Sequence, residues 1–410
     1  MSPLSRLALL LISLCFAACA SPAPQMAAER RPQPVILISI DGFRPDYLDR
    51  GLTPHLAALA ERGVRGAMRP AFPSKTFPNH YTLVTGLRPD RHGIVDNTMA
   101  DPQMPGRTFS LGNAAEVTDA AWWNEATPIW VTAERAGLPT ATMFWPGSEA
   151  GIGGVHPTYW MKFDQSMSAQ ARVDQVLAWL DQPERPAFLT LYFDEVDSYG
   201  HWNGPDSEEV NAALARTDAA VGRLVDGLEA RGLLAQTELV VVADHGMAAT
   251  SRARTIVLED LVEAADGRAL VTGPYLAFAP APDRRAQAEA ALLREHDHMD
   301  CWRKDELPAR FAYGQHRRVP EIFCLAEIGW EILPRATAGR RPMAGGAHGY
   351  DPADPAMAAL FLAAGPSFRS GVVLPVFENV DVYPLLARLL GVAPEANEGD
   401  LQALAPALGS

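Results

Sequence analysis

The chain has 410 residues, of which 48% are hydrophobic and 20% are charged, and this composition excludes intrinsic disorder for the bulk of the chain. Its length is enough for one large α/β domain or two ordinary ones. Lys and Arg number 35 against 49 Asp and Glu, a net charge of -14 without a basic block, so binding to a nucleic-acid polymer is not expected. An acidic protein that handles phosphate has to neutralise it locally, and metal ions are the usual means.

The first 19 residues have the features of an export signal. Arg6 precedes an apolar run, residues 7–18, that is too short to span a bilayer. Phe16-Ala17-Ala18-Cys19 resembles a bacterial lipobox, in which the cysteine is lipidated and becomes the mature N-terminus; plain secretion is the alternative. Residues 20–33 are expected to form a flexible tether. The chain is therefore expected outside the cytoplasm, free in the periplasm or anchored to the outer membrane through Cys19.

Apolar runs typical of buried strands alternate with amphipathic helical patterns along the chain. The predicted strands are 34–40, 140–145, 187–193, 238–243 and 357–363. The predicted helices are 54–62, 169–180 and 207–228. This alternation predicts an α/β fold with a doubly wound, largely parallel central sheet and helices on both faces. The alternation of strands and helices stops at about 258–331. This break predicts a smaller insertion within a single domain that spans residues 34–405.

Two cysteines remain beyond the export signal, Cys301 and Cys324. In an oxidising compartment this pair is able to form a disulfide, and two buried free thiols are the alternative. Neither cysteine belongs to a CxxC motif, so a cysteine-bound zinc is not expected.

Acidic and imidazole side chains follow several predicted strands. Asp41 follows the first strand, Asp197 and His201 follow the third, and Asp244 and His245 follow the fourth. His348 lies in a glycine-rich turn before the last strand. Because ligands gather beyond the carboxyl ends of strands in a doubly wound sheet, these side chains are expected to meet there. Carboxylate and imidazole sets of this kind favour zinc, although Asp197 and His201 alone also fit an ordinary loop.

A cluster of hydroxyl groups offers candidate nucleophiles. Ser74, Thr76 and Thr82 lie in one stretch, and spacing alone does not choose among them, since any hydroxyl needs a base or a metal to act as a nucleophile. Asn97 is a candidate hydrogen-bond donor to a developing negative charge, and a turn asparagine is the alternative.

Seven short motifs link these candidates. They are D-G-F-R-P-D-Y-L from Asp41, K-T-F-P-N-H-Y-T-L-V-T-G from Lys75, H-G-I-V-D-N from His92, F-W-P-G-S from Phe144, D-x-x-x-H-x-x-G-P from Asp197, D-H-G-M from Asp244 and G-x-H-G-Y-D from Gly346. In this order they resemble the nucleotide pyrophosphatase/phosphodiesterase family of the alkaline phosphatase superfamily, and the chain is identified as a bacterial member. The resemblance covers about residues 34–400.

The resemblance implies a zinc-dependent hydrolase of phosphodiester and pyrophosphate bonds. By it, one zinc is held by Asp197, His201 and His348. The other is held by Asp41, Thr76, Asp244 and His245. Thr76 is then the nucleophile that forms a covalent phospho-threonine, and Asn97 steadies the phosphoryl oxygen.

The expected substrate is a small nucleotide that is cleaved to a nucleoside monophosphate. Phe77, Tyr159 and Tyr192 match positions at which family members stack a nucleobase, although these aromatic residues are also compatible with an ordinary core. A cation–π cage for choline phosphodiesters is an alternative. Further alternatives are a phosphomonoesterase on the same scaffold and a zinc-binding lipoprotein without activity.

Overall fold

The computed structural model describes residues 33–340 and 343–409. The predicted signal with Cys19, and the predicted tether up to residue 32, lie outside the described residues. No helix in the described ranges has the length and the apolar character that a membrane span requires. Contacts group the described residues into one compact unit.

A nine-stranded sheet lies at the centre of this unit, in the order β18-β2-β17-β8-β1-β7-β5-β6, with β19 paired to β2. The strands are β1 (Val35–Ile40), β2 (Val64–Arg69), β5 (Thr140–Met143), β6 (Tyr159–Trp160), β7 (Phe188–Phe193), β8 (Glu238–Val242), β17 (Ala359–Ala364), β18 (Val372–Val373) and β19 (Phe377–Glu378). From β8 to β6 all neighbours are parallel. The strand β17 runs antiparallel to both of its neighbours, β8 and β2. The predicted, largely parallel sheet is confirmed.

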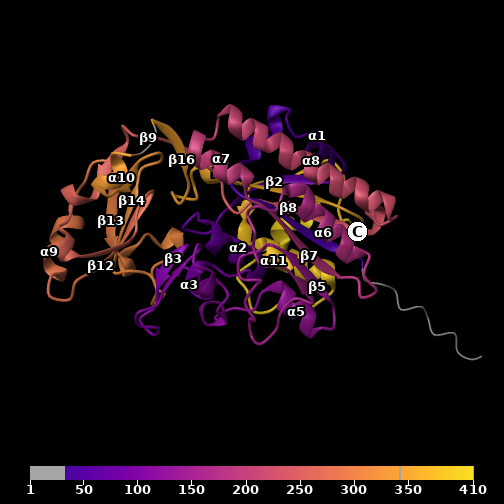
Figure 1. Ribbon diagram of the computed structural model, residues 1–410, viewed down its shortest axis with the longest axis horizontal. Helices are drawn as coiled ribbons and strands as arrows, with labels where there is room; N and C mark the ends of the chain where they lie inside the picture. The colour runs from indigo at the N-terminus through magenta and orange to yellow at the C-terminus, as the bar shows by residue number, and fades with distance from the viewer. Residues whose placement is uncertain (1–32, 341–342, 410) are drawn as a thin grey trace, which may run out of the picture. The chain divides into compact units, whose positions relative to one another are not determined.

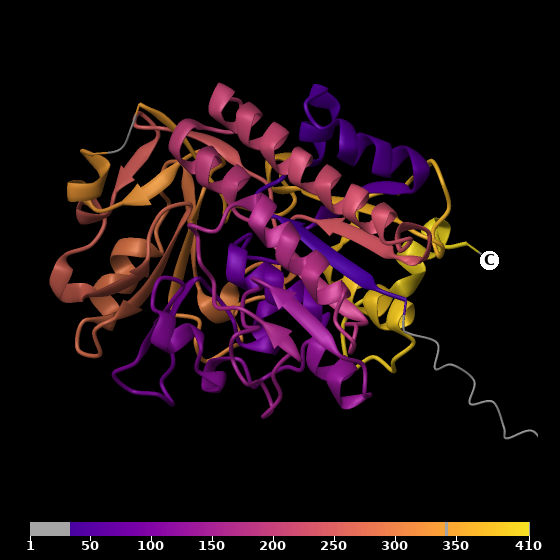
Figure 2. The ribbon, with the colours of Figure 1, turned by 45° about the vertical axis from the view of Figure 1, so that its right-hand side comes forward.

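Helices cover both faces of the sheet (Figures 1 and 2). On one face, α1 (Pro54–Arg62) and α6 (Ala169–Leu180) pack on α8 (Glu208–Ala230). On the other face, α2 (Thr76–Thr85), α5 (Ile129–Arg135) and α11 (Val382–Leu390) contact one another. The remaining helices are α3 (Pro89–His92), α4 (Ala114–Val117), α7 (Glu195–Asn203), α9 (Arg285–Leu292) and α10 (Arg335–Ala338).

The longest helix shows how the sequence specifies these elements. The Ser207 hydroxyl accepts a hydrogen bond from the Val210 amide at the start of α8, and Glu208 and Glu209 in the first turn favour the positive end of the helix dipole. One stripe of α8, including Leu214 and Leu224, is fully buried. Each such leucine contributes about 1.5–3 kcal/mol when it leaves water.

The predicted insertion forms a separate layer (Figure 1). It has an apolar core of its own that includes Leu276, Phe278 and Ile322. Its antiparallel sheet has the order β11-β12-β14-β13, built from β11 (Gly267–Val271), β12 (Tyr275–Pro280), β14 (Ile322–Ala326) and β13 (Met299–Arg303). Cys301 and Cys324 face each other across β13 and β14 and form the predicted disulfide. Three small strand pairs frame this layer: β3 (Thr98–Ala100) with β4 (Thr108–Ser110), β9 (Ala248–Ser251) with β16 (Ala344–Ala347), and β10 (Thr255–Val257) with β15 (Glu331–Leu333).

A buried arginine ties the insertion to the chain around residues 93–101. The side chain of Arg318 is 0% exposed, and its Nε donates to Asp101 Oδ2 at 2.7 Å. Its Nη1 donates to the Gly93 carbonyl at 2.7 Å, and its Nη2 lies 2.9 Å from Glu125 Oε1. A buried guanidinium is tolerated only when it is paired in this way.

Replacing Arg318 by Met is expected to lower the free energy of unfolding by about 1–3 kcal/mol, because the buried Gly93 and Trp122 carbonyls lose their donor and Asp101 keeps only Arg317. Denaturant titration followed by circular dichroism measures this loss. Arg223→Met is the control, since Arg223 pairs with Asp174 at the surface and such pairs contribute about 0–1 kcal/mol. Equal losses in the two variants would contradict the assignment.

The same cluster predicts a pH dependence of stability. Burial opposes ionisation of Asp101, but hydrogen bonds from Arg317 and Arg318 outweigh it and lower the pKa of this carboxyl to about 2. Because the folded pKa lies below the unfolded one, the stabilisation is complete above about pH 4. It is lost as the pH falls toward 2, so the stability difference between wild type and Arg318→Met is expected to shrink over that range in acid titrations.

Candidate active site

Three central strands deliver polar side chains to one edge of the sheet. Asp41 directly follows β1, and Asp244 and His245 follow β8. After β7 the chain turns into α7, which carries Asp197 and His201. These two residues are therefore on a helix rather than in a loop, and their spacing of four places them on the same helical face.

The remaining predicted ligands come from outside the central strands. His348 directly follows β16, and β16 contacts α7. Thr76 is the first residue of α2, where the positive end of the helix dipole favours a negative charge. Gly42, which follows β1 and Asp41, allows α7 to approach the end of β1. Its φ is +68°, and a Cβ there would lie 3.1 Å from the Asp197 Cα.

Asp197, His201 and His348 form one half of the site. The Nε2 atoms of His201 and His348 lie 3.5 and 3.6 Å from Asp197 Oδ1. The same two Nε2 atoms lie 3.1 Å from each other. All three residues of the first predicted zinc set are thus brought together.

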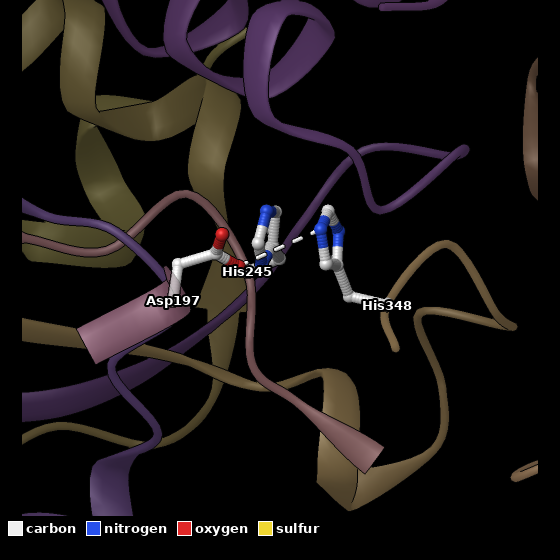
Figure 3. Close-up of side chains that lie close together, drawn as sticks. All are labelled: Asp197, His245 and His348. Atoms are coloured by element: carbon white, nitrogen blue, oxygen red, sulfur yellow. Dashed lines mark ion pairs between the residues drawn. The ribbon is translucent and has the colours of Figure 1, made fainter. Parts of the chain in front are cut away.

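Asp41, Asp244, His245 and Thr76 form the other half. His245 Nε2 lies 2.9 Å from Asp244 Oδ2, 3.5 Å from Asp41 Oδ1 and 3.4 Å from Thr76 Oγ1. The two halves adjoin, because the rings of His245 and His348 stack with centroids 3.5 Å apart. Figure 3 shows Asp197, His245 and His348 turned toward one another.

The three histidines present the same nitrogen to the centre. Nδ1 of His201, His245 and His348 each lies 2.8–2.9 Å from a backbone carbonyl, that of Gly346, Gly246 and Ser74 respectively. Since a carbonyl only accepts, each Nδ1 carries the proton and each Nε2 presents a lone pair. The Nε2 atoms of His201 and His348 lie 3.1 Å apart, so two lone pairs face each other. A cation bound to both nitrogens would remove the repulsion between them.

Buried carboxylate oxygens also lack partners at this centre. Asp41 Oδ1, Asp197 Oδ1 and Asp244 Oδ2 are buried and accept no hydrogen bond. Burial, with the negative charges of Asp244 and Asp197, raises the pKa of Asp41 well above its usual value. Burial lowers the pKa of His348 well below its usual value, so its ring is neutral, as a metal ligand requires. Orphaned carboxylates and neutral imidazoles fit divalent zinc.

His80 also approaches this half of the site, with its Nδ1 3.4 Å from Asp244 Oδ2. Both of its ring nitrogens are already used, since Nδ1 lies 2.8 Å from the Thr76 carbonyl and Nε2 lies 2.8 Å from the Ser39 hydroxyl. Burial lowers its pKa to about 3. His80 therefore supports the start of α2 as a neutral, hydrogen-bonded histidine.

The three candidate hydroxyls differ in their surroundings. Ser74 is fully buried and donates to the Tyr350 carbonyl at 3.0 Å. Thr82 is also fully buried, with its hydroxyl 3.0 Å from His92 Nε2. Thr76 alone among the three lines a cavity of about 450 Å³, together with Asn97 and the first half of the site.

Asn97 is oriented by the backbone of α2. Its Oδ1 accepts a hydrogen bond from the Phe77 amide at 2.8 Å. This contact leaves the Nδ2 protons of Asn97 as donors at the cavity beside Thr76. Asn97 and Thr76 therefore line the same cavity.

The predicted aromatic residues are not brought together. Phe77 packs beside Phe109, and the Tyr192 hydroxyl donates to Asp41 Oδ2 at 2.7 Å, so Tyr192 supports a candidate ligand. Tyr159 lies at the edge strand β6, where its ring stacks on Trp179 and its hydroxyl donates to the Glu184 carbonyl. Tyr159 therefore packs at the edge of the core and makes these contacts outside the candidate active site.

Sequence reasoning missed another aromatic residue, Phe163. Its ring is 47% exposed and lies 6.1 Å from the Tyr192 ring, which itself contacts Asp41. The guanidinium of the buried Arg172 lies 5.9 Å from its centre. Its position, in a stretch without strand or helix periodicity, gave no signal; only the fold places it there.

The chain matches a family model described as type I phosphodiesterase/nucleotide pyrophosphatase over residues 35–351. It is 36% identical over 389 residues to an uncharacterized pyrophosphatase/phosphodiesterase of Schizosaccharomyces pombe, covering 91% of this chain and 80% of that protein. It is 37% identical over 390 residues to human ectonucleotide pyrophosphatase/phosphodiesterase family member 1, covering 92% of this chain and 42% of that protein. The chain thus spans less than half the length of this human relative.

Solved structures share the whole fold. Human ectonucleotide pyrophosphatase/phosphodiesterase 5 matches with a TM-score of 0.88 and 34% identity, covering 92% of this chain and 100% of that one. The murine protein, solved as an inactive threonine-to-alanine variant in complex with AMP, matches equally, with a TM-score of 0.88, 34% identity and the same coverage. The chain belongs to the type I phosphodiesterase/nucleotide pyrophosphatase family, whose members are phosphodiester-hydrolysing enzymes.

Proposed function

We propose that this enzyme hydrolyses phosphodiester or pyrophosphate bonds of nucleotides, with Thr76 as nucleophile and two zinc ions, and releases nucleoside monophosphates. The observation that carries the proposal is the convergence of three orphaned carboxylate oxygens and three imidazole Nε2 atoms beside a cavity-facing threonine. Asp197, His201 and His348 would hold one zinc. Asp41, Thr76, Asp244 and His245 would hold the other.

The chain's own groups account for the positioning. The Thr76 oxygen attacks phosphorus as the bond from phosphorus to the leaving oxygen breaks, and the electron pair departs on that oxygen. Water then cleaves the phospho-threonine and restores the hydroxyl. The Asn97 side-chain amide and the Thr76 backbone amide would donate to the phosphoryl oxygens. Bound zinc supplies the positive charge that lowers the hydroxyl pKa and stabilises the leaving oxygen.

The murine structural relative supports a nucleotide substrate, since its inactive variant was solved with AMP. Exposed Phe163, beside Tyr192, and half-buried Phe77 offer aromatic surface near Asp41 and Thr76. Aromatic rings of this kind stack on a nucleobase at about 1–3 kcal/mol per base.

Thr76→Ala is expected to abolish turnover of the nitrophenyl ester of thymidine monophosphate, because no hydroxyl remains to attack phosphorus. Loss of the phospho-threonine in mass spectra of quenched reactions checks the same step. Ser74→Ala is the matched control and is expected to retain the phosphoenzyme, since the Ser74 hydroxyl faces the Tyr350 carbonyl.

The same assay separates the substrate classes. Chelator-sensitive preference for the nucleotide ester over nitrophenyl phosphate and nitrophenyl phosphorylcholine is expected. Preference for the monoester would make the protein a phosphatase, and preference for phosphorylcholine would make the aromatic residues a cation cage. Zinc binding without any turnover would favour the binding-protein hypothesis.

Asp244→Asn is expected to lower the zinc content from about two ions per chain to about one, because it removes a buried anionic ligand. Elemental analysis of dialysed protein measures the content. Asp297→Asn is the control: Asp297 also precedes a histidine, but His298 pairs with Glu327 at the surface. An unchanged zinc content in Asp244→Asn would rule out the ligand assignment.

We further propose that the chain is exported and anchored through a lipid on Cys19, on the pattern of residues 16–19. Cys19→Ser is expected to move the protein from the membrane fraction to the soluble periplasmic fraction, because a lipidated cysteine supplies the membrane affinity. Cell fractionation with immunoblotting measures this. Cys15→Ser is the matched control, and an equal distribution of both variants would contradict anchoring at Cys19.

A further inference from the structure

The loop of residues 70–75 joins β2 to α2 and connects the two halves of the candidate active site. It ends directly before Thr76, the candidate nucleophile. Two residues before Thr76, the Ser74 carbonyl accepts the Nδ1 proton of His348 at 2.8 Å. A contact that fixes this loop therefore also fixes the Thr76 oxygen relative to a candidate zinc ligand of the other half.

The fully buried side chain of Asn79, near the start of α2, spans this loop. Its Oδ1 accepts a hydrogen bond from the Ala71 amide at 2.8 Å. Its Nδ2 lies 3.2, 3.0 and 3.0 Å from the carbonyl oxygens of Ala71, Pro73 and Lys75. Because an amide N–H only donates and a carbonyl only accepts, these contacts fix the orientation of the Asn79 amide.

A second buried asparagine, from the C-terminal part of the chain, holds Asn79 in this position. Asn379 is 1% exposed and lies in a short 3-10 helix, Asn379–Asp381, that leads into α11. Its Nδ2 donates to Asn79 Oδ1 at 2.8 Å, although the two residues are 300 positions apart in the sequence. Asn79 Oδ1 thus accepts two hydrogen bonds, which is the full capacity of an amide oxygen.

Thr76 is restrained from both sides by these contacts. On the helix side, His80 Nδ1 donates to the Thr76 carbonyl at 2.8 Å. On the loop side, Lys75 is the cap residue of α2 but makes no side-chain hydrogen bond to the helix. The Asn79 amide, which lies 3.0 Å from the Lys75 carbonyl, is therefore the side-chain contact that restrains the residue directly before Thr76.

We propose that Asn79 and Asn379 are positioning residues for Thr76: together they hold loop 70–75 so that the Thr76 oxygen is aligned for attack on phosphorus. The inference rests on the proposed function and adds to it a dependence of the attack step on a buried residue near the C-terminus. Neither asparagine is among the described residues that line the cavity, so the pair acts on the geometry of attack and leaves substrate binding unchanged.

Asn379→Leu tests the proposal, because it keeps a side chain of similar size and removes only the amide that holds Asn79. It is expected to lower kcat for the nitrophenyl ester of thymidine monophosphate about 10- to 100-fold and to leave KM unchanged, since a displacement of the attacking oxygen by about 1 Å costs on the order of 100-fold in rate. Rapid-quench mass spectrometry is expected to show phospho-threonine formation slowed by the same factor. An unchanged kcat overturns the inference.

Asp218→Asn is the matched control for a purely structural effect. Asp218 is 2% exposed, and its carboxylate accepts from the His55 and Leu56 amides at the start of α1, on the other face of the central sheet. This variant also weakens buried hydrogen bonds at a helix start, so it is expected to lower stability in denaturant titrations without changing kcat or KM. Equal losses of kcat in Asp218→Asn and Asn379→Leu overturn the positioning role.

A double variant tests whether Asn379 acts through Asn79. In the Asn79→Ala background, adding Asn379→Leu is expected to change kcat by less than about twofold, because the contact between the two amides is already absent. Independent, multiplying losses overturn this coupling. Asn79→Ala removes a donor and an acceptor from a buried loop, so the kinetics of the single variant Asn379→Leu decide the inference if the double variant does not fold.

Zinc content separates this inference from the proposed function. Asn379→Leu is expected to hold as much zinc as the wild type in elemental analysis, and a loss of kcat that is restored by added zinc overturns the positioning role. A wild-type enzyme that forms phospho-threonine, together with an Asn379→Leu variant of equal kcat, overturns the inference alone. A wild-type enzyme that forms no phospho-threonine fails the proposed function itself.

Discussion

The site depends on a concentration of buried, unpaired charge that the fold does not neutralise by itself. Asp41, Asp197 and Asp244 each keep a buried carboxylate oxygen without a hydrogen bond, and the Nε2 atoms of His201 and His348 face each other at 3.1 Å. Desolvated anions beside lone pairs are costly unless a cation is present. The catalytic proposal follows from this need for positive charge. Zinc ions that neutralise the carboxylates would also lower the hydroxyl pKa of Thr76.

The large buried core of the sheet supplies the folding free energy that offsets the destabilising effect of this unpaired charge. The strands β1, β7 and β8 are buried along their whole length, and their carboxyl ends carry or lead into the acidic residues. Backbone carbonyls then fix each imidazole through Nδ1, which sets ring orientation and tautomer together. The insertion adds Tyr275 and Arg318, which reach from its strands and loops to the segment that carries Asp96 and Asn97.

Much of this arrangement is predictable from the sequence, because strand ends in a parallel sheet converge whatever the side chains are. Five strands of the central sheet, the helices α1, α6 and α8 and the strand-end acids follow from apolar periodicity. The cysteine count allows the disulfide, with two free thiols as the alternative. The helices α2 and α7 were missed; α7 is polar, and the spacing of its Asp197 and His201 also fits a loop. Phe163 was missed because it lies in an irregular segment without periodicity, and Tyr159 lies on the two-residue strand β6, so only tertiary packing fixes how either ring lies relative to the site.

The most direct test of the account is a crystal structure of the zinc-loaded protein with anomalous scattering measured at the zinc edge. The account predicts one zinc among Asp197, His201 and His348, and a second bound by Asp41, Asp244 and His245 with Thr76 Oγ1 within about 2.0–2.2 Å. A single metal distant from Thr76, or no metal between these side chains, would contradict the assignment of Thr76 as a zinc-activated nucleophile.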